Sequence, residues 1–128
     1  MSCILVIDDD GDTREALSEL LNAWGVRVRA AANGIEGIAQ LSYETPALIL
    51  LDTWMPAMGG DQFLDWLDNR SEYDTVPAVV MTADSGAVSH PRALAVLQKP
   101  YDLDQLLRYV RQFCPPPSPP ARIAAGGR

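Results

Sequence analysis

The feature that most constrains this sequence is a pair of short apolar runs, each of which stops at a carboxylate. Residues 3–7 (Cys-Ile-Leu-Val-Ile) lead directly into Asp8, and residues 47–51 (Ala-Leu-Ile-Leu-Leu) lead directly into Asp52. A five-residue run bounded by turn-forming or polar residues, without alternation, is typical of a strand buried on both faces of a parallel sheet. Parallel strands need helical crossover connections, so the two runs predict an α/β fold.

The rest of the chain supplies the remaining strands and helices. Charged and apolar residues alternate over residues 26–30, which predicts a strand at the sheet edge. Asp12 with Glu15 three residues later predicts a capped helix start, and Gly25 predicts the end of that helix. The expected strands are residues 3–7, 26–30, 47–51, 77–81 and 95–98, and amphipathic helices are expected around residues 12–24, 35–41, 63–67 and 103–113. This alternation of strands and helices predicts a sheet with helices on both faces and right-handed crossover connections.

Composition divides the chain into a folded part and a tail. Residues 115–120 are five prolines and one serine, and small residues dominate the rest up to residue 128. Such a segment lacks the side chains for a core and favours polyproline II or disorder. We therefore expect one domain over residues 1–114 and a flexible tail or severed linker over residues 115–128.

Charge and cysteine content exclude several classes of function. The formal net charge of −7 argues against nucleic acid or an anionic membrane as the main partner, because both need a basic footprint. Cys3 and Cys114 form no CxxC motif, which predicts free thiols in a reducing cytoplasm. No apolar run approaches the ~18 residues of a membrane span. His90 precedes Pro91 in an irregular segment and is expected to be exposed to solvent.

Polar side chains stand where the expected strands end. In such folds ligands bind outside the carboxyl ends of the strands, and these ends carry Asp8 and Asp9, Asp52, Thr82 and Lys99. Carboxylates gathered together raise one another's pKa unless a cation is present, and hard oxygen ligands favour Mg²⁺. An ammonium and a hydroxyl beside them suit a transferring phosphoryl group. Asp52 would then be the nucleophile and would form an acyl phosphate.

Four segments in this order resemble the response-regulator receiver domain of two-component signalling. They are residues 4–10 (Ile-Leu-Val-Ile-Asp-Asp-Asp), 50–60 (Leu-Leu-Asp-Thr-Trp-Met-Pro-Ala-Met-Gly-Gly), 79–83 (Val-Val-Met-Thr-Ala) and 98–100 (Gln-Lys-Pro). The resemblance extends over about residues 1–114. It implies a doubly wound, five-stranded parallel sheet of flavodoxin-like order 2-1-3-4-5, with helices on both faces.

The resemblance also implies roles for the polar residues. Asp52 would be the phosphoacceptor, supplied by a histidine kinase or a histidine phosphotransfer protein, and the signal would pass to an unknown downstream protein. Thr82 and Lys99 would contact the phosphoryl oxygens, and the peptide bond before Pro100 is similar to one that is cis in the family. The implied Mg²⁺ ligands are Asp9 and Asp52 directly, Asp8 through the metal's waters, and the backbone carbonyl of Trp54.

This sequence departs from the usual receiver sequence at two places, and both concern the output of the domain. Receivers usually carry an aromatic residue three positions before the lysine, where this chain has Val96. The segment between Thr82 and Lys99 is also short for the family, which predicts a shortened fourth helix.

The residues also allow two other functions. A degenerate receiver would act only as a protein-docking module. A haloacid-dehalogenase-type phosphatase would use Asp8 of the Asp-Asp-Asp-Gly segment as its nucleophile. The phosphoacceptor interpretation is preferred, and it predicts a signalling domain rather than an enzyme that turns over substrate.

Overall fold

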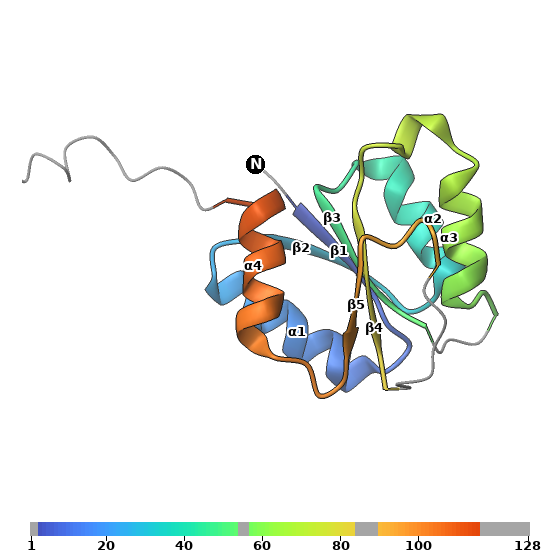
Figure 1. Cartoon of the computed structure of the whole chain (residues 1–128). Coiled ribbons are helices and arrows are strands. Elements are labelled where there is room, and N and C mark those ends of the chain that lie inside the picture. Colours follow the sequence, from blue (N-terminus) through green and yellow to red (C-terminus); the bar gives the residue numbers. More distant parts are fainter. Residues whose placement is uncertain (1–2, 54–56, 84–89, 116–128) are drawn as a thin grey trace, which may run out of the picture.

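Five parallel strands form one sheet in the order β2-β1-β3-β4-β5 (Figure 1). The structure is a computed structural model that describes residues 3–53, 57–83 and 90–115 of the 128. The strands are β1 (Cys3–Ile7), β2 (Arg27–Ala31), β3 (Leu48–Asp52), β4 (Ala78–Thr82) and β5 (Ala95–Gln98). The expected fold class and strand order are confirmed.

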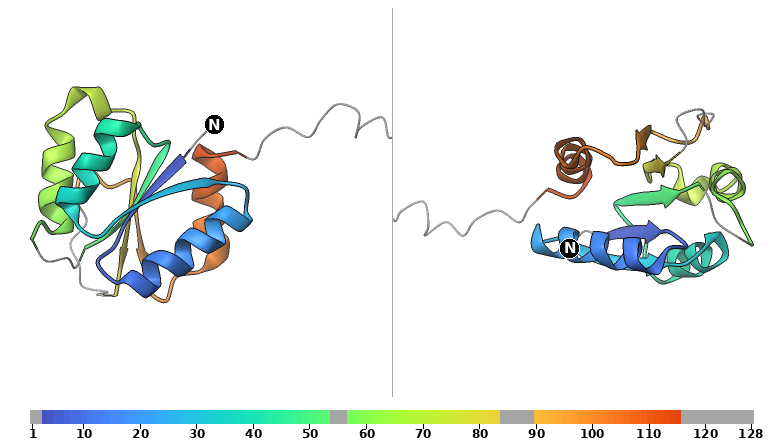
Figure 2. Two further views of the ribbon diagram at one scale, coloured as in Figure 1. Left: turned by 180° about the vertical axis from the view of Figure 1, so that it is seen from behind. Right: turned by 90° about the horizontal axis from the view of Figure 1, so that it is seen from below.

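Helices cover both faces of this sheet. They are α1 (Gly11–Ala23), α2 (Gly34–Tyr43), α3 (Gly60–Asp68) and α4 (Leu103–Phe113), and a short 3-10 helix, η1 (Ser71–Tyr73), follows α3. Figure 2 shows α1 and α4 on one side of the sheet and α2 and α3 on the other. Among the described residues, no helix has the length and apolar character needed to span a membrane.

Alternate residues of each central strand belong to two separate cores. Every residue of β1, β3 and β4 is buried, which explains their unbroken apolar sequences. Ile4 and Val6 pack with Leu17 of α1 and Leu106 of α4. The residues between them face the other core, which is formed with α2 and α3 and includes the fully buried Phe63. At the edge of the sheet, β2 is partly exposed, as its alternating sequence predicts.

The expected start of the first helix is wrong by two residues. Asp10, and not Asp12, is the capping residue of α1: its side chain accepts from the Asp12 amide at 3.2 Å and from the Thr13 hydroxyl at 2.6 Å. Residues 8–12 contain four aspartates, each of a residue type that can cap a helix, and sequence spacing alone did not distinguish them. The end is as expected, because Gly25 has φ +85°, a conformation that favours glycine.

Between β4 and β5, residues 84–89 lie outside the described part of the chain, so the shortened helix expected between Thr82 and Lys99 stays a prediction. Residue 83 and residues 90–94, which are described, contain no helix, and Val96 of β5 is 39% exposed. His90 is not exposed as expected: its side chain is 14% exposed and its Nε2 lies 2.7 Å from Oδ1 of Asp65 on α3. Arg92 donates to the backbone carbonyls of Tyr73 and Val76, both at 2.7 Å. These long-range contacts hold the segment before β5 against α3 and η1.

The two cysteines are free and buried, in agreement with the sequence. Burial raises the pKa of the Cys114 thiol to about 11, which keeps it protonated at neutral pH. Cys114 directly follows α4, and Pro115 is the last residue that the structure describes.

Candidate functional site

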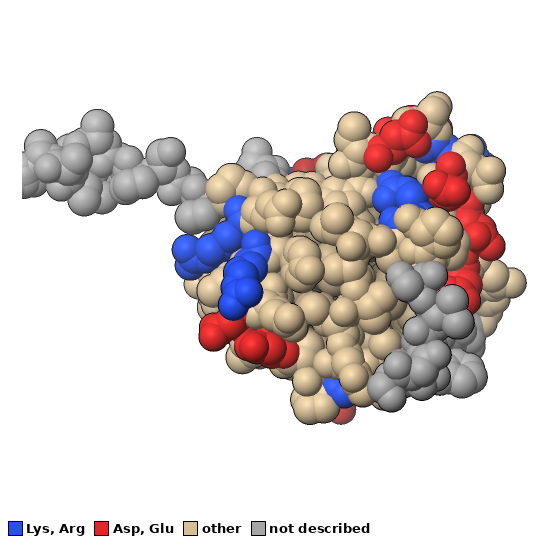
Figure 3. All heavy atoms as spheres, viewed as in Figure 1, with Lys and Arg blue, Asp and Glu red and all other residues tan. Residues whose placement is uncertain are grey.

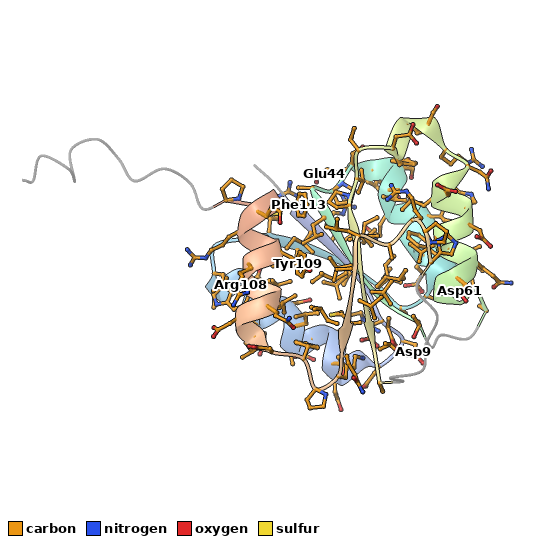
Figure 4. All side chains as sticks on the ribbon, in the orientation of Figure 1. Asp9, Glu44, Asp61, Arg108, Tyr109 and Phe113 are labelled. Atoms are coloured by element: carbon orange, nitrogen blue, oxygen red, sulfur yellow. The ribbon has the colours of Figure 1, made fainter. Side chains whose placement is uncertain are left out.

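The register of the sheet brings the polar strand ends together. Ile7 of β1 pairs with Leu51 of β3, so the residues that follow them, Asp8 and Asp52, are neighbours. Asp52 in turn lies opposite Met81, the residue before Thr82. Figure 4 labels Asp9 at this carboxyl edge of the sheet. The site is thus assembled by strand pairing between segments that are 44 residues apart for Asp8 and Asp52 and 30 residues apart for Asp52 and Thr82.

Three carboxylates converge at this edge. Oxygen atoms of Asp8, Asp9 and Asp52 all lie within 4.8 Å of one another. Asp8 is fully buried, Asp52 is 7% exposed, and Asp9 is exposed. The cluster therefore opens to solvent on the side of Asp9, while Asp8 lies at its base.

Lys99 places one positive charge against the two buried acids. Its Nζ lies 3.4 Å from Oδ2 of Asp8 and 3.7 Å from Oδ1 of Asp52. The lysine follows β5, and its backbone amide donates to the Thr82 carbonyl at 2.6 Å. The peptide bond between Lys99 and Pro100 is cis, as the resemblance implies. Lys99 is thereby attached to the strand that carries Thr82.

Thr82 ends β4 and is 1% exposed. Its hydroxyl lies 3.1 Å from that of Thr53, which donates to it. Thr53 was not among the predicted site residues, because nothing local shows that the residue after Asp52 contacts one 29 positions away. The contact links the end of β3 to the end of β4 beside the acidic cluster.

The loop between β1 and α1 is fixed by bonds to Asp8. Its Oδ1 accepts from the Asp10 amide at 2.9 Å, and its backbone carbonyl accepts from Nη1 of Arg14 at 2.7 Å. The hydroxyl of Thr13, more than any other group, lowers the pKa of the exposed Asp10 carboxyl. Arg14 is a second residue that was not predicted, since its spacing from Asp8 also suits an ordinary exposed helix residue.

Gly60, the first residue of α3, lies against the end of β3. A Cβ at this position would lie 2.9 Å from Cα of Thr53 and 3.2 Å from the carbonyl oxygen of Asp52. The Gly60 amide also donates to the Thr53 carbonyl at 3.3 Å. The close approach of α3 to the end of β3 thus depends on the absence of a side chain at Gly60. Trp54, the expected carbonyl ligand, lies outside the described residues.

The donor set fits a magnesium ion. Three carboxylates and one ammonium leave a local charge of about −2 when all are ionised, which a divalent cation would neutralise. All three side chains offer hard oxygen atoms, the ligand type that Mg²⁺ prefers. Exposure on the Asp9 side leaves room for the waters that Mg²⁺ retains.

The model of the response regulator receiver domain matches residues 4–111. The chain belongs to the response regulator receiver domain family. It is a phosphoacceptor domain of the kind used in two-component signalling, and the cluster of Asp8, Asp9 and Asp52 fits the phosphorylation site of such a domain.

Two relatives and one solved structure support this family assignment. The chain is 30% identical to sporulation initiation phosphotransferase F of Bacillus subtilis, over 88% of this chain and 93% of that protein. It is 32% identical to response regulator Rre1 of Synechocystis, over 86% of this chain but 50% of that protein. The structure resembles the response regulator TrrA of Thermotoga maritima in complex with Mg²⁺-BeF, with a TM-score of 0.79, 28% identity, and coverage of 88% and 99% of the two chains.

Proposed function

We propose that Asp52 accepts a phosphoryl group from a phosphohistidine of a histidine kinase or a histidine phosphotransfer protein. The observation that carries this proposal is the position of Asp52 between the other polar groups. It ends the central strand β3 and lies 3.7 Å from Nζ of Lys99. It also keeps 7% of its surface exposed, whereas Asp8 keeps none. Of the two buried acids, Asp52 is the one that an incoming phosphorus atom can reach.

In the proposed step, a carboxylate oxygen of Asp52 attacks phosphorus. The P–O bond to Asp52 forms as the P–N bond to the donor imidazole breaks, and the imidazole nitrogen recovers a proton. Lys99 and the hydroxyl of Thr82 would hold the oxygens of the transferred group, because a positive charge and a donor beside them stabilise its negative charge. The product is an acyl phosphate on Asp52.

The metal proposed here is Mg²⁺, held by Asp9 and Asp52, with Asp8 holding its waters and the Trp54 carbonyl as the remaining ligand. When bound, the ion would neutralise charge on the phosphoryl oxygens. Asp8 would keep its place through its bonds from the Asp10 amide and Arg14. The solved structure of TrrA, which is a complex with Mg²⁺-BeF, supports the choice of metal.

Phosphorylation would add about −1.5 to −2 charge at pH 7 to this edge of the sheet and bias the domain toward an unidentified downstream protein. Sporulation initiation phosphotransferase F and a 34% identical segment of hybrid signal transduction histidine kinase D of Dictyostelium discoideum support a kinase or phosphotransfer partner. We assign residues 1–114 to the receiver and residues 115–128 to a tail. The proposed role is that of a cytoplasmic acceptor rather than a turnover enzyme.

The test is phosphorylation of the full chain by acetyl phosphate with Mg²⁺, followed by intact mass. Wild type should gain one phosphoryl group, and Asp52→Asn should gain none. Glu72→Gln is the control, because Glu72 is an exposed acid on η1, which follows the end of α3 opposite to Gly60, and it should behave as wild type. Lys99→Ala should still accept the group but lose any conformational response.

Two results would overturn the proposal. Normal labelling of Asp52→Asn with loss of labelling in Asp8→Asn would support the phosphatase alternative. Absence of labelling in correctly folded wild type, also with a phosphorylated histidine kinase as donor, would support the docking module.

A further inference from the structure

A groove lies at the opposite edge of the sheet from the acidic site. Its volume is about 520 Å³, and its apolar lining includes Pro77 before β4, Pro91 and Leu94 before β5, and Phe113 at the end of α4. Leu94 is 50% exposed. Figure 4 labels Phe113 and Asp9 at opposite ends of the molecule. The groove is therefore separate from the phosphoacceptor site.

Acidic side chains outnumber basic ones along the groove, by two to one among the residues that line it. Asp68 and Asp74 both line it and are both exposed. Arg92 also lines it, but its guanidinium donates to the carbonyls of Tyr73 and Val76. In the face shown in Figure 3, acidic side chains lie along the border of a broad uncharged surface. A groove that exposes prolines, a leucine and one aromatic ring beside two carboxylates suits a proline-rich segment that ends in a basic residue.

The chain itself carries such a segment next to the groove. Two residues after Phe113 the sequence continues Pro-Pro-Pro-Ser-Pro-Pro-Ala-Arg, and Arg122 and Arg128 are the sole charged side chains after Arg111. We propose that residues 116–122 bind in this groove as a polyproline II segment, with Arg122 beside Asp68 and Asp74. Seven residues in that conformation span about 22 Å, enough to cross a groove of this size.

Three physical effects favour this occupant over a separate molecule. Proline rings can pack on exposed apolar side chains such as Leu94 and Phe113 with little loss of conformational entropy, since polyproline II is already extended. The two acids attract a basic side chain. Attachment at Phe113 makes binding intramolecular and so raises the effective concentration of the segment.

The experiment is NMR on the full-length chain. In wild type we expect nuclear Overhauser contacts between the proline rings of residues 116–120 and the side chains of Leu94 and Phe113. Arg122→Glu should abolish them, whereas Arg128→Glu, the same change of charge six residues further on, should leave them. Combining Arg122→Glu with Asp68→Lys and Asp74→Lys should restore the contacts by reversing both charges.

Absence of these contacts in folded wild type would overturn the proposal, as would equal effects of Arg122→Glu and Arg128→Glu. Contacts that disappear on dilution, together with a doubled mass in light scattering, would instead identify a second copy as the occupant. Phosphorylation of Asp52 is a separate measurement, so failure here leaves the proposed function intact.

Discussion

Replacing Gly60 by alanine should destabilise the domain and disturb its acceptor residue. The new Cβ would lie 2.9 Å from Cα of Thr53 and 3.2 Å from the carbonyl oxygen of Asp52. Both atoms belong to the backbone, so the strand end must move. Such overpacking costs about 1–3 kcal/mol, and the gain of about 0.5–1 kcal/mol from removing a glycine offsets part of it. We expect a net loss of about 1–2 kcal/mol.

Gly11→Ala provides a matched control. Gly11 and Gly60 are the first residues of α1 and α3, but a Cβ on Gly11 would meet nothing closer than Nη2 of Arg14 at 3.7 Å. That distance is ordinary contact, so Gly11→Ala should be neutral or slightly stabilising.

Urea unfolding measures the difference between the two variants. With a slope of about 1–2 kcal/mol per molar urea, the midpoint of Gly60→Ala should fall by roughly 0.5–2 M. Phosphorylation of Gly60→Ala by acetyl phosphate should also slow, since the Asp52 backbone is displaced. If Gly60→Ala were as stable as Gly11→Ala, the close approach between α3 and the end of β3 would be refuted.

Three further changes test the core, the site and a surface ion pair. Phe63→Ala should cost about 3–5 kcal/mol in urea unfolding because Phe63 is fully buried, whereas Leu103→Ala, at a side chain that is 50% exposed, should stay within about 1 kcal/mol; similar losses would contradict the assigned core. Lys99→Met should tighten Mg²⁺ binding about tenfold in calorimetry because it removes a positive charge beside two acids; weaker binding would count against a shared metal site. The side-chain bond from Arg27 holds the pKa of Glu44 at about 2, below its usual 4.5. The stabilising effect of the Arg27–Glu44 ion pair is therefore present above pH 4.5 and is lost as the pH falls toward 2. As the pH falls from 4.5 toward 2, the difference in unfolding free energy between wild type and Glu44→Gln should therefore shrink. A difference that stays constant would contradict the ion pair.

The sequence was sufficient to predict the sheet and the residues at its carboxyl edge. Apolar runs such as residues 3–7 mark strands buried on both faces, and parallel strands bring their ends to one edge. Asp8, Asp9 and Asp52 therefore converge as expected. Even the exposed strand β2 was recognisable from its alternating charges.

Contacts that depend on three-dimensional register were not predictable in this way. The Thr53–Thr82 contact and the bond from Arg14 to the Asp8 carbonyl join residues whose spacing carries no signal. His90 was expected to be exposed because proline follows it, but Asp65 on α3 lies close enough to bind it. Local patterns identify which residues form an element, whereas the partner of a polar side chain depends on elements far away in the sequence.

The position of the phosphoryl group tests the central claim most directly. Wild-type chain is incubated with acetyl phosphate and Mg²⁺, quenched in acid and mapped by peptide mass spectrometry. We expect a single modified residue, Asp52, and no modification when Mg²⁺ is removed by a chelator. A phosphoryl group on Asp8, or modification of Asp52 that is unaffected by the chelator, would contradict the assignment of Asp52 as a magnesium-dependent acceptor.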